Sequence, residues 1–304
     1  MMNIVVVGSS NTDMIVQVPR IPKPGETILG GKFSTAAGGK GANQAVAAAR
    51  AGGQVAFVTR VGMDMFGEKA LEGFKKDNLN IDYVFKDPDA PSGIAEIFVA
   101  KDGENSIAVA SGANANLSPL DIKKAESVIA DAGILVMQLE IPIETVVAAA
   151  KLAKSHGVDI ILNPAPAQPL SDELLSLITI LTPNESEAEL LTGVAVQDEP
   201  SAKQAADILH QKGVSTVVIT MGARGAYVSD ASFSGMIPAK SVKAVDATAA
   251  GDVYNGALAV ALSEKKQLSD AVVFANTAAA LSVTKLGAQP SAPFKNEILK
   301  FLGV

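Results

Sequence analysis

The sequence has 304 residues, enough for one large domain or two smaller ones, and its net charge is −7. Apolar residues make up 48% and charged residues 19%, so the chain can bury a sizeable core and is not disordered. The negative charge argues against a nucleic-acid partner held by bulk electrostatics, although an anionic small molecule needs only a local positive site. Cysteine is absent, which excludes disulfides and thiolate metal sites. With no signal-peptide pattern and no membrane-spanning apolar run, we expect a cytoplasmic protein without a membrane partner.

Short, nearly all-apolar runs recur along the chain and end at Gly, Pro, Asn or Glu, which is typical of strands buried on both faces. These runs cover residues 3–8, 55–62, 134–140, 159–166, 178–185 and 216–222. Amphipathic patterns over 144–156, 185–192 and 201–212 predict helices between several of them. The alternation predicts an α/β fold, a Rossmann-like and mostly parallel sheet flanked by helices, in a single domain over residues 1–304. Ligands of such sheets bind at the carboxyl ends of the strands.

Two stretches interrupt the alternation. Residues 12–36 contain alternating short strands with a Pro-Gly turn, and residues 92–111 show a similar pattern with a hairpin at Asp102 and Gly103. Neither stretch has a helical crossover. We therefore predict a small β-lid that covers the strand ends of the α/β body.

The stretch "AVDATAAGDVYNGALAVAL", residues 244–262, places Asp252 at the start of an Ala-rich helical pattern. Backbone N–H groups at a helix N-terminus have no intrahelical partners and carry the positive end of the helix dipole. Ala249, Ala250 and Gly251 present these amides with little side chain in the way, so an anion can approach closely. A carboxylate beside a bound phosphate is suited to take a proton from an attacking hydroxyl. The alternative, an ordinary capping Asp, does not account for the small residues before it.

A second Gly-rich helix start, "AAGGKGANQAVAAARAGG", covers residues 36–53. Gly39 and Gly41 allow close approach of the backbone, while Lys40 and Asn43 can donate hydrogen bonds to ligand hydroxyls. The stretch differs from the Walker loop G-x-x-x-x-G-K-[ST], because here a glycine follows the lysine. The alternative is a Gly-rich turn that only starts a helix.

Polar side chains follow two of the predicted strands. Asn11 and Asp13 come after the first strand, where an amide and a carboxylate two residues apart suit a neutral polyol; an Asx turn is the alternative. Glu140 ends another strand, as a substrate contact or a simple edge carboxylate. The dinucleotide fingerprint G-x-G-x-x-G is missing, which disfavours a nicotinamide cofactor.

Two further stretches are candidates for binding a nucleotide. Asn184 and Glu187, three residues apart at the start of a helix, could orient phosphate, water or Mg²⁺, although Glu in a first turn is also ordinary dipole chemistry. Thr220, Gly222 and Gly225 form a loop that could pass under a nucleotide. Its alternative is a plain hairpin turn.

Together these segments resemble the ribokinase family of carbohydrate kinases, the phosphofructokinase-B-type group. The resemblance covers essentially the whole chain, from "VVVGSSNTD" to "KLGAQPSAP". The two signature regions of the family are "AGGKGANQAVAAARAG" and "VDATAAGDVYNGAL", and their joint presence in this order is far more specific than either alone. Within the family, "QLEIP", "LNPAPA" and "TPNESEAELLTG" are similar to segments of the members that phosphorylate ribose.

The resemblance implies an ATP-dependent kinase that makes D-ribose 5-phosphate, with Asp252 as the base for the O5 hydroxyl and Ala249–Gly251 as the anion hole. It implies a ribose pocket lined by Asn11, Asp13, Gly39, Lys40, Gly41, Asn43 and Glu140. It implies ATP contacts from Asn184, Thr220, Gly222, Gly225, Gly251 and Asn276, with Glu187 near Mg²⁺. It implies an activating K⁺ site at Asp246, Thr248, Ser282, Lys285, Gly287 and Ser291, several of them through backbone carbonyls. Relatives are often dimeric through the β-lid, so we expect a homodimer.

The sequence departs from the family pattern at Ala247, where these kinases more often have Thr, and at Val253 and Tyr254. The alanine keeps its backbone amide, so K⁺ affinity is the property that the change puts in question. A kinase for another pentose, a ketohexose or a nucleoside stays an alternative, although 4% aromatic residues offer little wall for a base. A catalytically silent sugar-binding relative is the alternative from another class, yet it would not need Asp252.

Overall fold

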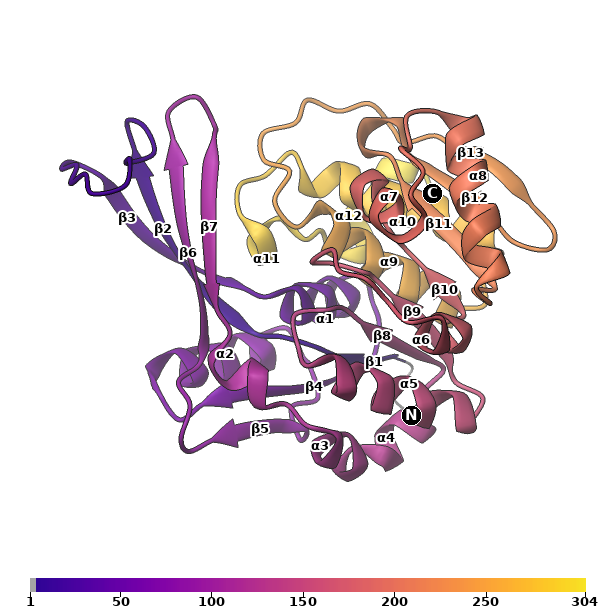
Figure 1. Cartoon of the computed structure of the whole chain (residues 1–304), viewed down its shortest axis with the longest axis horizontal. Helices are drawn as coiled ribbons and strands as arrows, with labels where there is room; N and C mark the ends of the chain where they lie inside the picture. Colours follow the sequence, from indigo (N-terminus) through magenta and orange to yellow (C-terminus); the bar gives the residue numbers. More distant parts are fainter. Residues whose placement is uncertain (1–3) are drawn as a thin grey trace.

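The computed structural model describes residues 4–304, in which a large sheet forms the body and a smaller sheet projects from it (Figure 1). The strands of the large sheet are β1 (Ile4–Val7), β4 (Val55–Gly62), β5 (Val84–Asp87), β8 (Ile134–Met137), β9 (Asp159–Leu162), β10 (Ile180–Leu181), β11 (Thr216–Thr220), β12 (Ala226–Ser229) and β13 (Ser234–Ile237). Their order is β13-β12-β11-β10-β9-β8-β1-β4-β5, and only β11–β12 and β12–β13 pair antiparallel. The predicted α/β fold with a mostly parallel sheet is confirmed. Residue 3, included in the first predicted strand, lies outside the described residues.

Helices cover both faces of this sheet. One face packs against α3 (Pro119–Lys124), α4 (Glu126–Ala130), α5 (Ile143–Ser155), α6 (Asp172–Leu177), α7 (Glu185–Thr192) and α8 (Glu199–Gln211). The other packs against α1 (Lys40–Arg50), α2 (Met65–Lys76), α9 (Ala250–Ser263), α10 (Leu268–Ser282) and α12 (Lys295–Leu302). The short elements are α11 (Ala288–Ser291) and the 3₁₀ turns η1 (Gly112–Asn116) and η2 (Gly222–Arg224). No helix within residues 4–304 is long and apolar enough to span a membrane.

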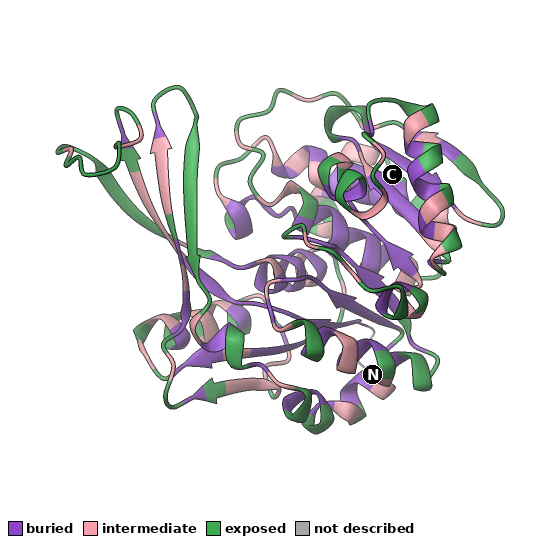
Figure 2. Cartoon of the chain, viewed as in Figure 1, coloured by how far each residue is buried: buried purple, intermediate pink, exposed green. Residues whose placement is uncertain are grey.

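The apolar runs in the sequence are explained by this double cover. Along β1, Val5 and Val7 belong to the core on one face, while Ile4 and Val6 belong to the core on the other. Successive side chains of a strand point to opposite faces, so a strand covered on both sides must be apolar throughout. Figure 2 shows these central strands buried, in contrast to the exposed outer part of the smaller sheet.

Several strands are shorter than their apolar runs predict, and the difference is largest for β9 and β10. The run over 159–166 forms β9 only as far as Leu162, and the run over 178–185 forms β10 over Ile180–Leu181 alone. Each strand stops one residue before an X-Pro pair, at Pro164 and Pro183. Proline has no N–H to continue a ladder, so the chain leaves the sheet there.

The chain winds away from β1 in two directions. From β1 it passes to β4 and β5 on one side, and then from β8 through β9 and β10 to β11 on the other. β1 pairs in parallel with both β4 and β8, so the winding reverses between β1 and β8. In such sheets the crevice at the carboxyl ends of the strands beside the reversal is the usual ligand site.

The smaller sheet has the strands β2 (Asn11–Val18), β3 (Lys32–Gly38), β6 (Gly93–Ala100) and β7 (Asn105–Ala110), in the order β3-β2-β6-β7. It combines the strands predicted over 12–36 and 92–111, and the hairpin around Gly103 is present. The two halves join through a parallel β2–β6 pair, which no sequence pattern indicated. β2 begins only three residues after β1 ends, so this sheet stands directly over the ligand crevice of the body.

Helices α1 and α9, which carry both signature regions, cross closely. Gly256 of α9 faces α1, where an added Cβ would stand 2.7 Å from the carbonyl oxygen of Gln44 and 2.8 Å from Cβ of Ala47. Alanines on both helices are fully buried in the shared core. Small residues therefore set the distance between the two helices.

We expect Gly256→Ala to lower the free energy of unfolding by about 1–3 kcal/mol, because the added methyl group would push α1 and α9 apart. The matched control is Gly73→Ala in α2, where an added Cβ meets nothing within 4 Å. There alanine should raise the free energy of unfolding by about 0.5–1 kcal/mol through its better helix propensity. Denaturant titration measures both, and equal effects of the two substitutions would contradict this packing.

Candidate active site

Two cavities meet at the N-terminus of α9, at the carboxyl ends of the parallel strands. One cavity, of about 310 Å³, lies under the smaller sheet of β2, β3, β6 and β7, which we call the lid, and is named the lid-side cavity. The other, of about 450 Å³, lies beside α10. They share Asn184, Thr220, Ala247, Ala250 and Gly251 as lining residues. The run of small residues before Asp252 therefore forms the boundary between two adjoining cavities.

Asp252 lies in the first turn of α9 and is 5% exposed. Its Oδ2 accepts a hydrogen bond from Nδ2 of Asn43 at 2.9 Å, and its Oδ1 accepts one from Nε2 of Gln44 at 3.0 Å. Burial raises the pKa of Asp252, while the Lys40 ammonium and the two amide donors oppose this. The carboxylate is thus fixed in direction and lines the lid-side cavity.

The backbone before Asp252 is bent. Ala249 has φ 58°, in the left-handed region that residues other than glycine rarely adopt, and it caps α9. An αL residue beside helical ones brings successive N–H groups to one side, a geometry that binds anions. The amide of Ala250 donates to the carbonyl of Ala247 at 3.2 Å. Within residues 4–304, the amides of Ala249 and Gly251 have no backbone acceptor in this turn.

The lid-side cavity is lined by several charged groups. Asp13 on β2, Lys40 at the start of α1, Glu140 after β8 and Glu187 on α7 line it together with Asp252. Burial first, and then the charges of Glu140 and Asp252, raise the pKa of Asp13 to about 6. Burial alone would lower the pKa of Lys40, but the surrounding carboxylates raise it overall, so its ammonium stays charged.

Hydrogen bonds to neighbouring residues restrict which donors and acceptors Asn11 and Glu140 can offer a ligand. Asn11 Oδ1 accepts a hydrogen bond from Nδ2 of Asn114 at 2.7 Å, which leaves the amide N–H₂ of Asn11 as its free donor. Glu140 Oε2 accepts from the Ser9 hydroxyl at 2.6 Å and from the Lys40 amide at 2.9 Å. No sequence pattern indicated Asn114, because η1 lies about a hundred residues away from β2 along the chain.

The glycines of the first signature act by close packing. Gly39 has φ 87° and lines the cavity, and an added Cβ would stand 2.6 Å from the Asn11 amide nitrogen. Gly41, which we expected among the sugar contacts, does not line the cavity. Its Cα faces the backbone of Gly8 and Ser9, where an added Cβ would stand within 2.5 Å. It allows α1 to pack against the end of β1.

The other cavity has apolar walls and polar ends. All the predicted ATP contacts except Glu187 line it: Asn184, Thr220, Gly222, Gly225, Gly251 and Asn276. Its apolar lining comes mainly from Val242, Tyr254, Ala279, Ala280 and Val283. Among these the sequence singled out only Tyr254, as a departure from the family pattern and not as a contact. Aliphatic residues without a polar neighbour look like ordinary core in a sequence, so no signal could have found them.

Asn184 and Glu187 form a capping box at the start of α7. Asn184 Oδ1 accepts from the Glu187 amide at 2.8 Å, and Glu187 Oε2 accepts from the Asn184 amide at 2.9 Å. Glu187 is 7% exposed, and burial raises its pKa. The pair thus caps α7, and the Glu187 carboxylate also lines the lid-side cavity.

The residues expected around K⁺ come from the loop before α9 and from the segment that runs from the end of α10 to α11, and Asp246 joins the loops of these two segments. Its Oδ1 accepts from the Thr248 amide at 2.9 Å and its Oδ2 from the Gly287 amide at 2.8 Å. Burial opposes ionisation, but these donors hold the pKa of Asp246 below its usual range. The hydroxyls of Ser282 and Ser291 donate to backbone carbonyls, and the ammonium of Lys285 pairs with Glu297. The Lys285 side chain therefore points to α12, so only its backbone could take part.

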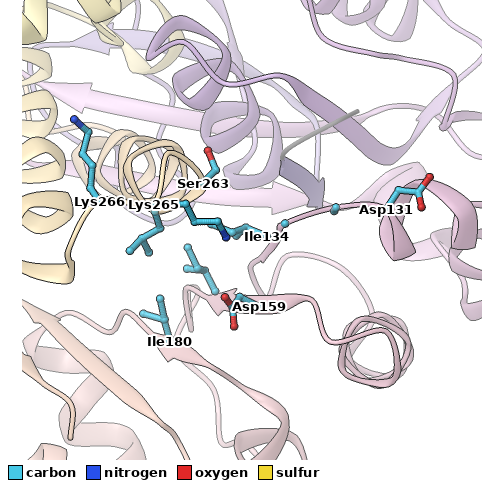
Figure 3. Close-up of a pocket in the computed structure, with 11 residues that line it drawn as sticks. Asp131, Ile134, Asp159, Ile180, Ser263, Lys265 and Lys266 are labelled. Atoms are coloured by element: carbon cyan, nitrogen blue, oxygen red, sulfur yellow. The ribbon is translucent and has the colours of Figure 1, made fainter. Parts of the chain in front are cut away.

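A further hollow of about 500 Å³ lies at the opposite edge of the sheet, where β8, β9 and β10 begin (Figure 3). Lys265 and Lys266 after α9, with Asp131 and Asp159, contribute its charged groups. In Figure 3 the ammonium of Lys266 and the carboxylate of Asp131 point away from its middle. Of its charged groups only Lys265 and Asp159 lie toward the middle, whereas five charged residues line the lid-side cavity.

A sequence model described as "pfkB family carbohydrate kinase" matches residues 1–295. The chain belongs to this family. It is 50% identical to the ribokinase of Haemophilus influenzae, with 98% of this chain and 97% of that protein covered. It is 38% identical to the deoxyribokinase of Salmonella typhimurium, with 100% and 99% covered. The structure of Arabidopsis thaliana ribokinase complexed with ribose and ATP superposes with a TM-score of 0.92, at 36% identity, and covers 100% of this chain and 99% of that one.

Because the pKa of Asp13 is raised in this pfkB-family chain, we predict that the free energy of unfolding depends on pH. The folded state holds the Asp13 proton up to about pH 6, while the unfolded chain loses it near 3.8, so ionisation destabilises the fold as pH rises through that window. We expect Asp13→Asn to raise the free energy of unfolding at pH 8 by about 1–3 kcal/mol, and the gain to vanish below about pH 4.

Thermal unfolding between pH 4 and 8 measures this difference, with the exposed Asp82→Asn as the matched control. Asp13→Asn should also weaken sugar binding, because the ionised carboxylate is the stronger hydroxyl acceptor. A destabilisation that does not change with pH would contradict the assignment.

Proposed function

We propose that this chain transfers the γ-phosphoryl group of MgATP to the O5 hydroxyl of D-ribose. One observation carries the proposal: Asp252 and the small-residue turn before it stand where a polar, charged cavity meets an apolar one. The polar cavity suits a polyol, and the apolar cavity suits a purine base with phosphates directed toward α9. The similarity to ribokinases over nearly the whole chain supports the same reaction.

In this mechanism the sugar lies under the lid with O5 toward Asp252. The amide of Asn11 donates to sugar hydroxyls, while Asp13 and Glu140 accept from them. Holding both substrates in line supplies much of the rate enhancement, because phosphoryl transfer depends on positioning and charge stabilisation. Asp252 accepts the O5 proton as that oxygen attacks, and the helix N-terminus stabilises the charge on the transferred group. Lys40 lies close enough to Asp252 to add positive charge there.

The donor set near α7 fits Mg²⁺, which prefers oxygen ligands and keeps several waters. Glu187 uses one carboxylate oxygen in its capping box, and within residues 4–304 no hydrogen bond occupies the other. We assign Glu187, with Asn184 beside it, as the residues that hold the ion, directly or through water. Bound Mg²⁺ would neutralise phosphate charge.

The two loops joined by Asp246 support a monovalent-cation site next to the anion hole. Thr248 and Ala288 line the lid-side cavity, so an ion held by these loops would lie close to the reacting groups. Ala247 lacks the hydroxyl of the Thr that these kinases more often have at this position, yet the Asp246 hydrogen bonds that join the loops come from backbone amides. We therefore propose that K⁺ activates the enzyme. The absence of cysteine also keeps the cytoplasm as the expected location.

2-Deoxyribose is the second candidate substrate, favoured by the similarity to a deoxyribokinase. Release of ADP with MgATP should be measured with ribose, 2-deoxyribose, fructose and adenosine, in potassium and in sodium buffer. Ribose should give the highest kcat/KM, with higher turnover in potassium. A preference for deoxyribose would change the substrate and keep the mechanism, whereas sugar binding without any turnover would indicate the silent relative.

We expect Asp252→Asn to lower kcat for the preferred sugar by at least ~10²-fold, the usual loss for an acid–base group, while the sugar dissociation constant changes little. The matched control is Asp270→Asn, an exposed acid in the first turn of α10. Single-turnover rates and calorimetric sugar binding give the two readouts. A wild-type kcat in Asp252→Asn would remove the base from this site.

We also propose that the lid pairs with the lid of a second copy. Large apolar side chains on its strands and outer loop are exposed: Leu29, Phe33, Ile107 and Val109. Light scattering should give twice the 31.1 kDa mass of the chain, and Phe33→Glu, on the lid face that does not line the cavity, should shift the mass toward one chain. A single-chain mass for the unmodified protein at micromolar concentration would contradict the dimer.

A further inference from the structure

Behind Asp252 lies a chain of buried side-chain amides. Gln44, on α1, is fully buried, and its Nε2 donates both to Oδ1 of Asp252 at 3.0 Å and to Oδ1 of Asn163 at 3.1 Å. Its Oε1 accepts from Nε2 of Gln138 at 2.7 Å. Gln138 follows β8 and Asn163 follows β9, so the amides tie the carboxylate to the ends of two strands.

The direction of these hydrogen bonds is set by a backbone group. Asn163 Nδ2 donates to the carbonyl oxygen of Thr182 at 3.2 Å, and a carbonyl can only accept. Asn163 therefore turns its Oδ1 toward Gln44, and Gln44 must donate a hydrogen bond to it from its N–H₂ group. With both hydrogens of Gln44 committed, its Oε1 faces Gln138. The backbone at Thr182 thus determines that Gln44 presents a donor to Asp252.

The same region holds the start of α9 from the other side. The Thr182 hydroxyl donates to Oδ1 of Asn255 at 2.6 Å, and Asn255 Nδ2 donates to the carbonyl of Gly251 at 2.8 Å. Asn255 is 1% exposed. The carboxylate of Asp252 and the turn that precedes it are therefore both connected through hydrogen bonds to Thr182.

Each element around Asp252 contributes a charged or titratable group. Lys40 comes from α1, Glu140 from the segment after β8, Asp13 from β2 and Glu187 from α7. Most of these groups are acids, which favour a protonated Asp252. Gln44 contacts the carboxylate from the buried side, away from the substrates, and so can favour the ionised form without occupying the face toward O5.

We propose that Gln44 is a positioning residue that keeps Asp252 ionised and turned toward the sugar hydroxyl. This inference rests on the proposed function, because it assumes that Asp252 is the base. It requires the donor at position 44 specifically, rather than a side chain that only fills space.

The variant Gln44→Glu tests the loss of the N–H₂ donor while the shape of the side chain is kept. Glutamate has nearly the volume of glutamine, and its carboxylate can still accept from Gln138. Its second oxygen, however, would face Oδ1 of Asp252 and Oδ1 of Asn163, which are both acceptors. Two buried carboxyls at hydrogen-bond distance share one proton. The variant should therefore hold Asp252 in its proton-sharing form at neutral pH.

The test is the pH dependence of the single-turnover rate at saturating ribose and MgATP. We expect Gln44→Glu to be slower by at least ~10-fold at pH 7, with its acidic limb at least about one pH unit higher and the rate recovering toward pH 9. The dissociation constant for ribose should stay within about threefold of the unmodified value. Gln204→Glu, which adds the same charge at an exposed position of α8, should leave rate and limb unchanged.

Gln44→Met is the second variant, because it keeps the volume and adds no charge, so it decides the matter if the glutamate variant does not fold. It should also be slower, with its acidic limb raised, since Asp252 has lost one donor. An unmoved limb in the folded Gln44 variants would overturn the proposal, even with a reduced rate. A wild-type rate in Asp252→Asn would instead overturn the proposed function.

Discussion

The rest of the site depends on one constraint: a carboxylate must be buried at the N-terminus of α9 without losing its hydrogen bonds. Asp252 meets it through two amides from α1, Asn43 and Gln44, so α1 must lie within hydrogen-bonding distance of α9. Gly256 and the buried alanines between the helices allow that distance. A buried carboxylate without hydrogen-bond donors would strongly destabilise the fold. The close packing of small residues is therefore needed to bring the amide donors of α1 to Asp252.

The two cavities that meet at Asp252 differ in their walls because different parts of the fold supply them. The lid-side cavity takes its groups from strand ends, where short loops expose amides and carboxylates to one crevice. The other takes most of its lining from α10 and the segment before α9, where Ala and Val predominate. The lid-side cavity therefore suits a polar sugar and the cavity beside α10 suits a nucleotide base, on opposite sides of the N-terminus of α9.

Sequence patterns predicted the sheet because strands buried on both faces must be apolar throughout, as β1 is. They predicted Asp252, Lys40 and Asn43 because each lies beside a glycine-rich turn that starts a helix. They overestimated β9 and β10, because the apolar pattern continues past the point where proline ends the ladder. The family resemblance assigned Gly41 to the sugar, and the sequence alone cannot distinguish a glycine that lines a cavity from one that packs against a strand.

The residues missed were those whose partners lie far away in the sequence. Asn114 meets Asn11 across 103 positions, and Gln44 meets Asp252 across 208. Asn114 lies in no local motif, and Gln44 lies within the first signature region without a pattern that indicates its partner. A buried amide has no periodicity of its own. The parallel β2–β6 pair was missed for the same reason, because register between distant strands depends on how the body brings them together.

The central claim is that Asp252 activates the primary hydroxyl at one end of the sugar. The position of the phosphate in the product tests this most directly, and phosphorus-31 and carbon-13 magnetic resonance of the product made from ribose and MgATP can assign it. We expect a single product with phosphorus coupled to C5 and the anomeric carbon free. Phosphorus coupled to C1, or release of inorganic phosphate in place of a sugar phosphate, would contradict it.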